Sequence, residues 1–175
     1  MFWETSVDRA NEKGMKAMEA RFMKESRTIQ TKLVLPPDTN HMDSIFGGKV
    51  LAYIDEIAGI TAMKHARRKV VVTASIDSVD FLSSARVGDV LELEANVTST
   101  GRTSMEVYVR VKSQNLQTGE EKLTTESFLT MVAMGDDGKP TPVPAVVPES
   151  EGEKLFFETA PARREHRKNR VKTPR

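Results

Sequence analysis

One segment constrains the fold more than any other, because it is helical in pattern and apolar on nearly every face. It covers 48–67 and, after its first glycine, reads KVLAYIDEIAGITAMKHAR. A helix of this kind is buried among other elements rather than lying on a surface. The sequence therefore predicts a central helix that the rest of the domain encloses.

Strand-like segments surround the predicted helix in the chain. RTIQTKLVL, at 27–35, precedes the helix and ends at two prolines, which forbid further ladder pairing. Four more follow it, at 70–81, 90–99, 104–113 and 122–134, and the middle two alternate apolar and polar residues as half-buried strands do. The breaks between these four are too short for parallel crossovers. The pattern predicts an α+β fold in which an antiparallel sheet wraps one helix.

The two ends of the chain differ from this predicted core, 27–135. Residues 1–26 are polar, with Met15, Met18 and Phe22 at helical spacing, which predicts a short helix or a flexible arm. Residues 136–175 combine a Pro-rich linker with a helix from about 150 to 168. That helix ends in a basic run, for which a solvated tail is the first interpretation and a phosphate contact the second.

Composition excludes several classes of function. Lys and Arg number 26 and Asp and Glu 25, so the net charge of +1 gives no field that favours nucleic acid. There is no cysteine, which removes disulfides, thiolate metal sites and cysteine nucleophiles. No signal sequence and no apolar run long enough to span a membrane is found, so we expect a cytoplasmic protein.

A carboxylate lies inside the apolar helix. On a helical wheel Asp55 falls among small and apolar residues such as Ala62, whereas Glu56 falls on the polar stripe. We therefore expect Asp55 to be shielded from water, which is costly unless the carboxylate is paired or functional. Pairing with Lys49, His65 or an arginine is an equally good interpretation at this point.

Gly47 and Gly48 precede the helix. Glycine allows a ligand to approach closely, and the first N–H groups of a helix have no partner within it, so a developing oxyanion could bind there. A Gly-Gly pair is also a common loop device. Asp55 follows Gly48 by two turns, roughly 10 Å at 1.5 Å per residue. We therefore expect a site that uses both groups to take them from different subunits.

The segments PPDTNHMDSIFGGKVLAYIDEIAG and SIDSVDFLSSARVGDVLELEANVTSTGRTSMEVYVRV closely resemble the hot-dog-fold acyl-CoA hydrolases of the cytosolic acyl-CoA hydrolase type. The resemblance covers about 28–134. It implies a sheet of five or six strands around a long central helix. It also implies homodimers joined edge to edge through their sheets, often assembled as trimers of dimers, that is, hexamers.

The same resemblance implies roles for four residues. It makes Asp55 the general base for an attacking water, or less readily a nucleophile, and Asn40 of the opposite subunit its partner in catalysis. Gly47 and Gly48 stand where the family polarises the thioester carbonyl. Without the resemblance, Asn40 reads as a loop residue that satisfies its own backbone. Neither a metal nor another cofactor is expected.

For coenzyme A, the resemblance points to a hairpin containing Arg102, Thr103 and Ser104, although a plain turn would look much the same. Arg68 is a weaker candidate, because a cation after a helix also complements the helix dipole. Two other functions stay open: a non-catalytic acyl-CoA-binding sensor or regulator, and a dehydratase that would use His41. We read His65 as structural.

Overall fold

The computed structural model describes residues 18–170. Its elements, in chain order, are β1 (Arg21–Phe22), α1 (Met23–Ser26), β2 (Thr28–Leu33), the 3-10 turn η1 (Pro36–Asp38), α2 (Gly47–Ala66), β3 (Val71–Phe81), β4 (Val90–Thr100), β5 (Ser104–Gln114), β6 (Glu121–Ala133), β7 (Val146–Val147) and α3 (Glu151–Lys168). None of the helices in this part of the chain is long and apolar enough to cross a membrane.

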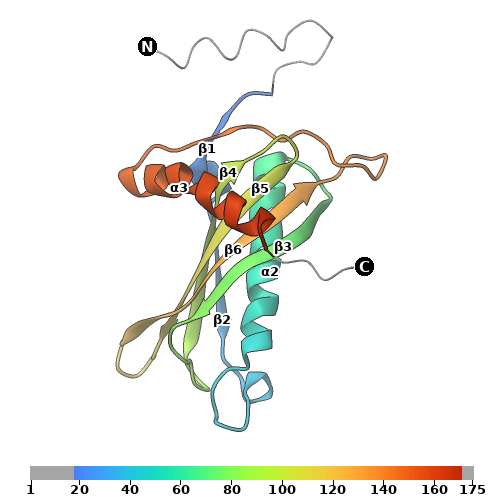
Figure 1. The fold of residues 1–175 in the computed structure, drawn as a ribbon. Coiled ribbons are helices and arrows are strands. Elements are labelled where there is room, and N and C mark those ends of the chain that lie inside the picture. The colour runs from blue at the N-terminus through green and yellow to red at the C-terminus, as the bar shows by residue number, and fades with distance from the viewer. Residues whose placement is uncertain (1–17, 171–175) are drawn as a thin grey trace, which may run out of the picture.

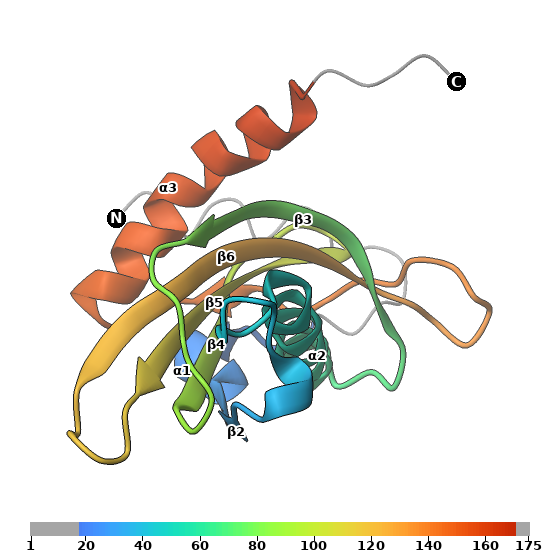
Figure 2. The ribbon, with the colours of Figure 1, turned by 90° about the horizontal axis from the view of Figure 1, so that it is seen from below.

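Five strands form one antiparallel sheet in the order β2-β4-β5-β6-β3. The sheet curves around α2, as Figure 1 shows, and Figure 2 shows α3 on the opposite, outer face. The predicted α+β class, the five strands and the wrapped helix are all confirmed. This is the hot-dog fold.

Alternation along the strands makes the core. In β4 and β5 every second side chain is fully buried on the inner face: Leu91, Leu93, Ala95, Val97, Met105, Val107, Val109 and Val111. On α2, Ile54, Ile57 and Ala58 are fully buried as well. The period of two in the strands therefore matches a sheet with one face on the core.

The two edge strands differ. Within the described part of the chain, β2 has six residues and pairs only with β4, whereas β3 has eleven and pairs only with β6. Two register shifts, between Thr73 and Ser75 and between Ile76 and Ser78, curve β3. Apolar side chains are exposed along β3 or at its end, among them Ile76 and Phe81. Such an edge offers unpaired backbone groups to another strand.

The segments outside the sheet are only partly as expected. Phe22 lies in β1, and the helical turn begins at Met23, so a helix through Met18 and Phe22 is wrong; Met15 lies outside the described residues. The Pro-rich segment is largely extended, but Val143 and Val146 are buried in the core and β7 pairs with β1.

The basic run at the end of α3 binds to the outer face of the sheet. Arg163 makes two bonds to the Glu106 carboxylate, at 3.0 and 2.8 Å. Arg167 and Arg170 each lie 3.1 Å from Asp77 of β3. The solvated-tail interpretation is wrong for these three arginines, because carboxylates far away in the sequence neutralise them.

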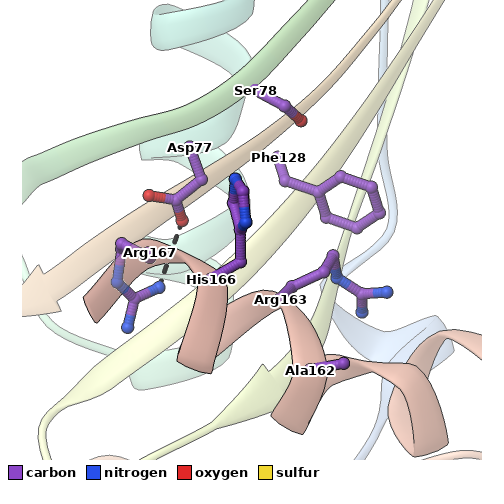
Figure 3. Close-up of a pocket in the computed structure, with 7 residues that line it drawn as sticks. All are labelled: Asp77, Ser78, Phe128, Ala162, Arg163, His166 and Arg167. Carbon is purple, nitrogen blue, oxygen red and sulfur yellow. Dashed lines mark hydrogen bonds and ion pairs between the residues drawn. The ribbon is translucent and has the colours of Figure 1, made fainter. Parts of the chain in front are cut away.

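A hollow of about 300 Å³ remains between α3 and the sheet. Figure 3 shows the Asp77–Arg167 ion pair on one side of it and Phe128, near Arg163, on the other. The guanidinium of Arg163 lies 4.3 Å from the centre of the Phe128 ring. Arg163 and Arg167 thus already pair with groups of the sheet and hold α3 against it. Little positive charge beside this hollow is left to bind a phosphate.

His65 is a structural contact at the end of α2. Its ring is buried, and Nε2 lies 2.9 Å from the carbonyl oxygen of Pro144, which can only accept, so Nε2 carries the proton. Nδ1 is buried without a partner. Burial lowers the pKa of His65 below its ordinary value of 6.5, against the bond to Pro144, which raises it.

We predict a pH dependence of stability from this residue. A His with a lowered pKa in the folded state stabilises the protein above pH 6.5, and that contribution is lost as the pH falls because the unfolded chain binds the proton more readily. Between pH 7 and 5 the free energy of unfolding should fall by up to about 1.4 kcal/mol per pH unit. His65→Gln keeps an N–H donor without titrating, and should flatten this slope in urea titrations at fixed protein concentration. An equal slope in both proteins would contradict the assignment.

Candidate active site

Asp55 lies where α2 faces the open edge of the sheet. Its Oδ1 accepts a 2.6 Å hydrogen bond from Thr73 Oγ1 on β3. The side chain is exposed within the single chain, so the expectation of a buried carboxylate is wrong for one protomer. A helical wheel shows which residues share a face but not where they lie along the axis. Ala62, two turns after Asp55, is fully buried. Asp55 is exposed because β3 is the last strand of the sheet and no further strand covers it. No ion pair involves Asp55 among residues 18–170.

Thr73 is the functional candidate that the sequence analysis missed. It pairs with Met131, which is buried on the inner face, so the Thr73 side chain also points toward α2. A hydroxyl on the otherwise apolar inner face of β3 was the available signal. It gave no indication of its partner, because Thr73 and Asp55 meet only through the packing of α2 on the sheet.

Asn40 holds its own loop together. Its Oδ1 accepts from the N–H of Met42 at 2.9 Å, from the N–H of Ser44 at 3.4 Å and from Ser44 Oγ at 3.2 Å. The loop interpretation is thus right for the oxygen. Among the described residues nothing accepts from Nδ2, which leaves the amide N–H groups available to a ligand.

The start of α2 offers a second pair of donors. The carbonyl of Phe46 accepts from Lys49 N at 2.8 Å and from Val50 N at 3.2 Å, which are the first bonds of the helix. Within residues 18–170 the N–H groups of Gly47 and Gly48 have no acceptor, and Phe46 provides no side-chain cap. Two unpaired amides at the positive end of a helix are suited to binding a developing negative charge.

Within one chain these groups do not form one site. Asp55 is eight residues after Gly47, about 12 Å along the helix at 1.5 Å per residue, and no hydrogen bond joins Asn40 to Asp55. Asp55 and the amides at the start of α2 both lie along β3, however. Thr73, near its start, holds Asp55, and Phe81, its last residue, places its ring 3.4 Å from where a Cβ on Gly47 would stand.

The candidate coenzyme A residues lie at the Asp55 end of the molecule. Ser104 and Val72 both pair with Val132, so the β4–β5 hairpin and the connection from α2 to β3 share one end of the sheet. Arg102, in the hairpin, and Arg68, in the connection, are exposed and in the described part of the chain form no ion pair. Thr103 and Ser104 are half-buried beside them.

No three His, Asp or Glu side chains of residues 18–170 gather closely enough to hold a metal ion. The candidate site therefore consists of a carboxylate, a carboxamide and backbone amides, with arginines at one end of the sheet. These groups can activate water and stabilise an oxyanion.

Comparison with known proteins identifies the family. The family model described as the thioesterase superfamily matches residues 42–120. The Bacillus subtilis (strain 168) protein named uncharacterized acyl-CoA thioester hydrolase YkhA is 51% identical over 156 residues, 89% of this chain and 90% of that protein. The chain belongs to the thioesterase superfamily.

Solved structures of this superfamily agree with the fold. An apo-hexameric acyl-CoA thioesterase is 70% identical, with a TM-score of 0.85 over 87% of this chain and 97% of that one. An acyl-CoA hydrolase from Staphylococcus aureus, in complex with butyryl coenzyme A, coenzyme A and coenzyme A disulfide, is 49% identical, with a TM-score of 0.80 over 85% of this chain and 90% of that one.

Three further structures of the Staphylococcus aureus hydrolase carry a replacement by alanine. The replaced residues are an aspartate, an asparagine 15 residues before it, and a threonine 17 residues after it. In this chain Asn40 also precedes Asp55 by 15 residues, and Thr73 follows Asp55 by 18.

Proposed function

We propose that this protein hydrolyses acyl-CoA thioesters to a carboxylic acid and coenzyme A, at sites that two copies of the chain build together. One observation carries the proposal: the carboxylate of Asp55 and the free amides of Gly47 and Gly48 lie near opposite ends of one open edge strand. The matching spacing of Asn40 and Asp55 in the Staphylococcus aureus hydrolase supports it.

Pairing of β3 with a second β3 would complete the site. In a twofold pair the edge strands run antiparallel, so the start of one strand faces the end of the other. Asp55, held at Thr73 near the start, would then face the partner's helix N-terminus, which lies at Phe81 near the end. The same pairing would cover Asp55, satisfy the backbone of β3 and bury exposed apolar residues such as Ile76.

The chemistry needs few groups. Oδ1 of Asp55 is fixed by Thr73, and Oδ2 is left to accept a proton from water as that water attacks the thioester carbonyl carbon. The carbonyl oxygen becomes an oxyanion, which the partner's helix N-terminal amides would stabilise. The carbon–sulfur bond then breaks, and the proton returns from Asp55 to the coenzyme A thiolate. No metal or redox cofactor is required for these steps.

Two details of the mechanism follow from the contacts. Nδ2 of Asn40, contributed by the opposite subunit, would hold the water or donate to the oxyanion, because its Oδ1 is already occupied. Attack by Asp55 itself, through a mixed anhydride, is the alternative path. Arg102, Thr103, Ser104 and Arg68 would meet the phosphates and adenine of coenzyme A at the same end of the sheet as Asp55.

We predict that the purified protein releases free thiol from acyl-CoAs and that Asp55→Asn lowers kcat by about 100- to 10,000-fold, the usual contribution of a general base. The assembly should persist, as size-exclusion chromatography would show. Glu56→Gln is the matched control, since Glu56 is an adjacent carboxylate whose partners among residues 18–170 are Gln30 and Lys32, on the surface. Binding of acyl-CoA without thiol release by the wild-type protein would indicate a sensor instead.

Thr73 is predicted to act as a positioning residue. Thr73→Val preserves shape but removes the bond to Asp55, and should lower kcat about tenfold, the equivalent of about 1.4 kcal/mol, with little change in KM. Thr73→Ser should restore most of kcat, because it keeps the hydroxyl. A Thr73→Val variant with the kcat of wild type would show that the hydroxyl of Thr73 has no part in positioning Asp55.

A further inference from the structure

A second hollow, of about 390 Å³, opens beside the start of α2. It lies between α2, the loop that follows β3, and β6. Gly47 forms part of its lining, Ile45, Val50, Phe81 and Leu82 give it apolar walls, and the rest of the lining consists of Ser83, Ser84 and Thr124. Val50 and Ile45 are buried, whereas Leu82 is 54% exposed. The hollow thus has buried apolar residues on one side, and the exposed Leu82 lies on another.

The walls of this hollow are fixed by backbone bonds. The N–H of Leu82 donates to the carbonyl of Thr124 at 2.8 Å, which ties the loop after β3 to β6. The N–H of Ile45 donates to the carbonyl of Ala85, also at 2.8 Å, which ties the segment before α2 to the same loop. The segments that bound the hollow are therefore fixed to the sheet by their backbones.

Gly47 connects the hollow to the chemistry, because the same residue lines the hollow and offers a free N–H. A thioester carbonyl carbon carries an oxygen, a sulfur and the first carbon of the acyl chain. With the oxygen on the amides of Gly47 and Gly48, and the sulfur directed toward the partner's hairpin arginine, the acyl carbon is left facing the hollow.

We propose that this hollow receives the acyl chain and that Leu82 limits the chain length that the enzyme accepts. The inference rests on the proposed function and deepens it. At about 30 Å³ for a group the size of water, the hollow holds roughly a dozen such groups, which fits a chain of up to about that many carbons. Within that length each added methylene should strengthen binding about fourfold.

The test compares kcat/KM for saturated acyl-CoAs from acetyl to palmitoyl in the wild-type protein, Leu82→Trp and Leu82→Ala. The kcat/KM values of each variant are divided by its own value on acetyl-CoA, so that only a change in chain-length preference is compared. The longest acyl chain that Leu82→Trp hydrolyses efficiently should be about two carbons shorter than in wild type. On the longest chain that wild type hydrolyses efficiently, kcat/KM of Leu82→Trp should fall at least tenfold. Leu82→Ala should shift the limit toward longer chains.

Leu116→Trp is the matched control, since Leu116 is 61% exposed in the β5–β6 hairpin and does not line the hollow. Its chain-length profile should equal that of wild type. If Leu82→Trp does not fold, as its melting temperature would show, Leu82→Ala and Leu82→Phe provide the same comparison. Active Leu82 variants with the wild-type profile would overturn the inference alone. A wild-type protein that releases no thiol from any acyl-CoA would overturn the proposed function, and the inference with it.

Discussion

The hydrogen bond from Thr73 to Asp55, made over an open sheet edge, is the contact on which the proposed site depends. It fixes the carboxylate near the start of β3, while the ring of Phe81 marks the strand's other end beside Gly47. One strand therefore separates the proton acceptor from the helix N-terminal donors. Asp55 and Gly47 also belong to one helix, about 12 Å apart along its axis. A single chain cannot bring them together without unfolding α2, so the proposed chemistry requires a second copy.

The outer helix supports this edge. Arg167 of α3 and Arg170, just beyond its end, both reach Asp77, at the position where the register of β3 shifts. Thr130 Oγ1 on β6 donates to the same carboxylate at 2.6 Å. The partly buried ion pairs thus add α3 to the elements that hold the edge strand, besides its ladder with β6 and its contact with α2 through Thr73 and Asp55. The basic run at the end of the chain is best understood as part of the scaffold that shapes the proposed dimer edge.

Much of the fold could be predicted from the sequence, because its signals are local. The core buries every second side chain around Val107 and Val109, and the alternation in the sequence indicates this directly. The apolar pattern of α2 indicates its burial in the same way. The surroundings of Asp55 could not be predicted, since a wheel does not reveal which strand will be an edge. The pairs Thr73–Asp55 and Arg163–Glu106 were missed because they join residues that only the packing of a helix on the sheet brings together.

The central claim, that each site uses groups from two chains, is tested most directly by mixing inactive subunits. Asn40→Ala and Asp55→Ala chains, each with a different affinity tag, would be combined and the mixed assemblies purified through both tags. In a mixed pair one site carries both defects and the other is intact, so thiol release from acyl-CoA should return to about half of the wild-type rate per pair. Mixed assemblies as inactive as their parents would contradict a shared site.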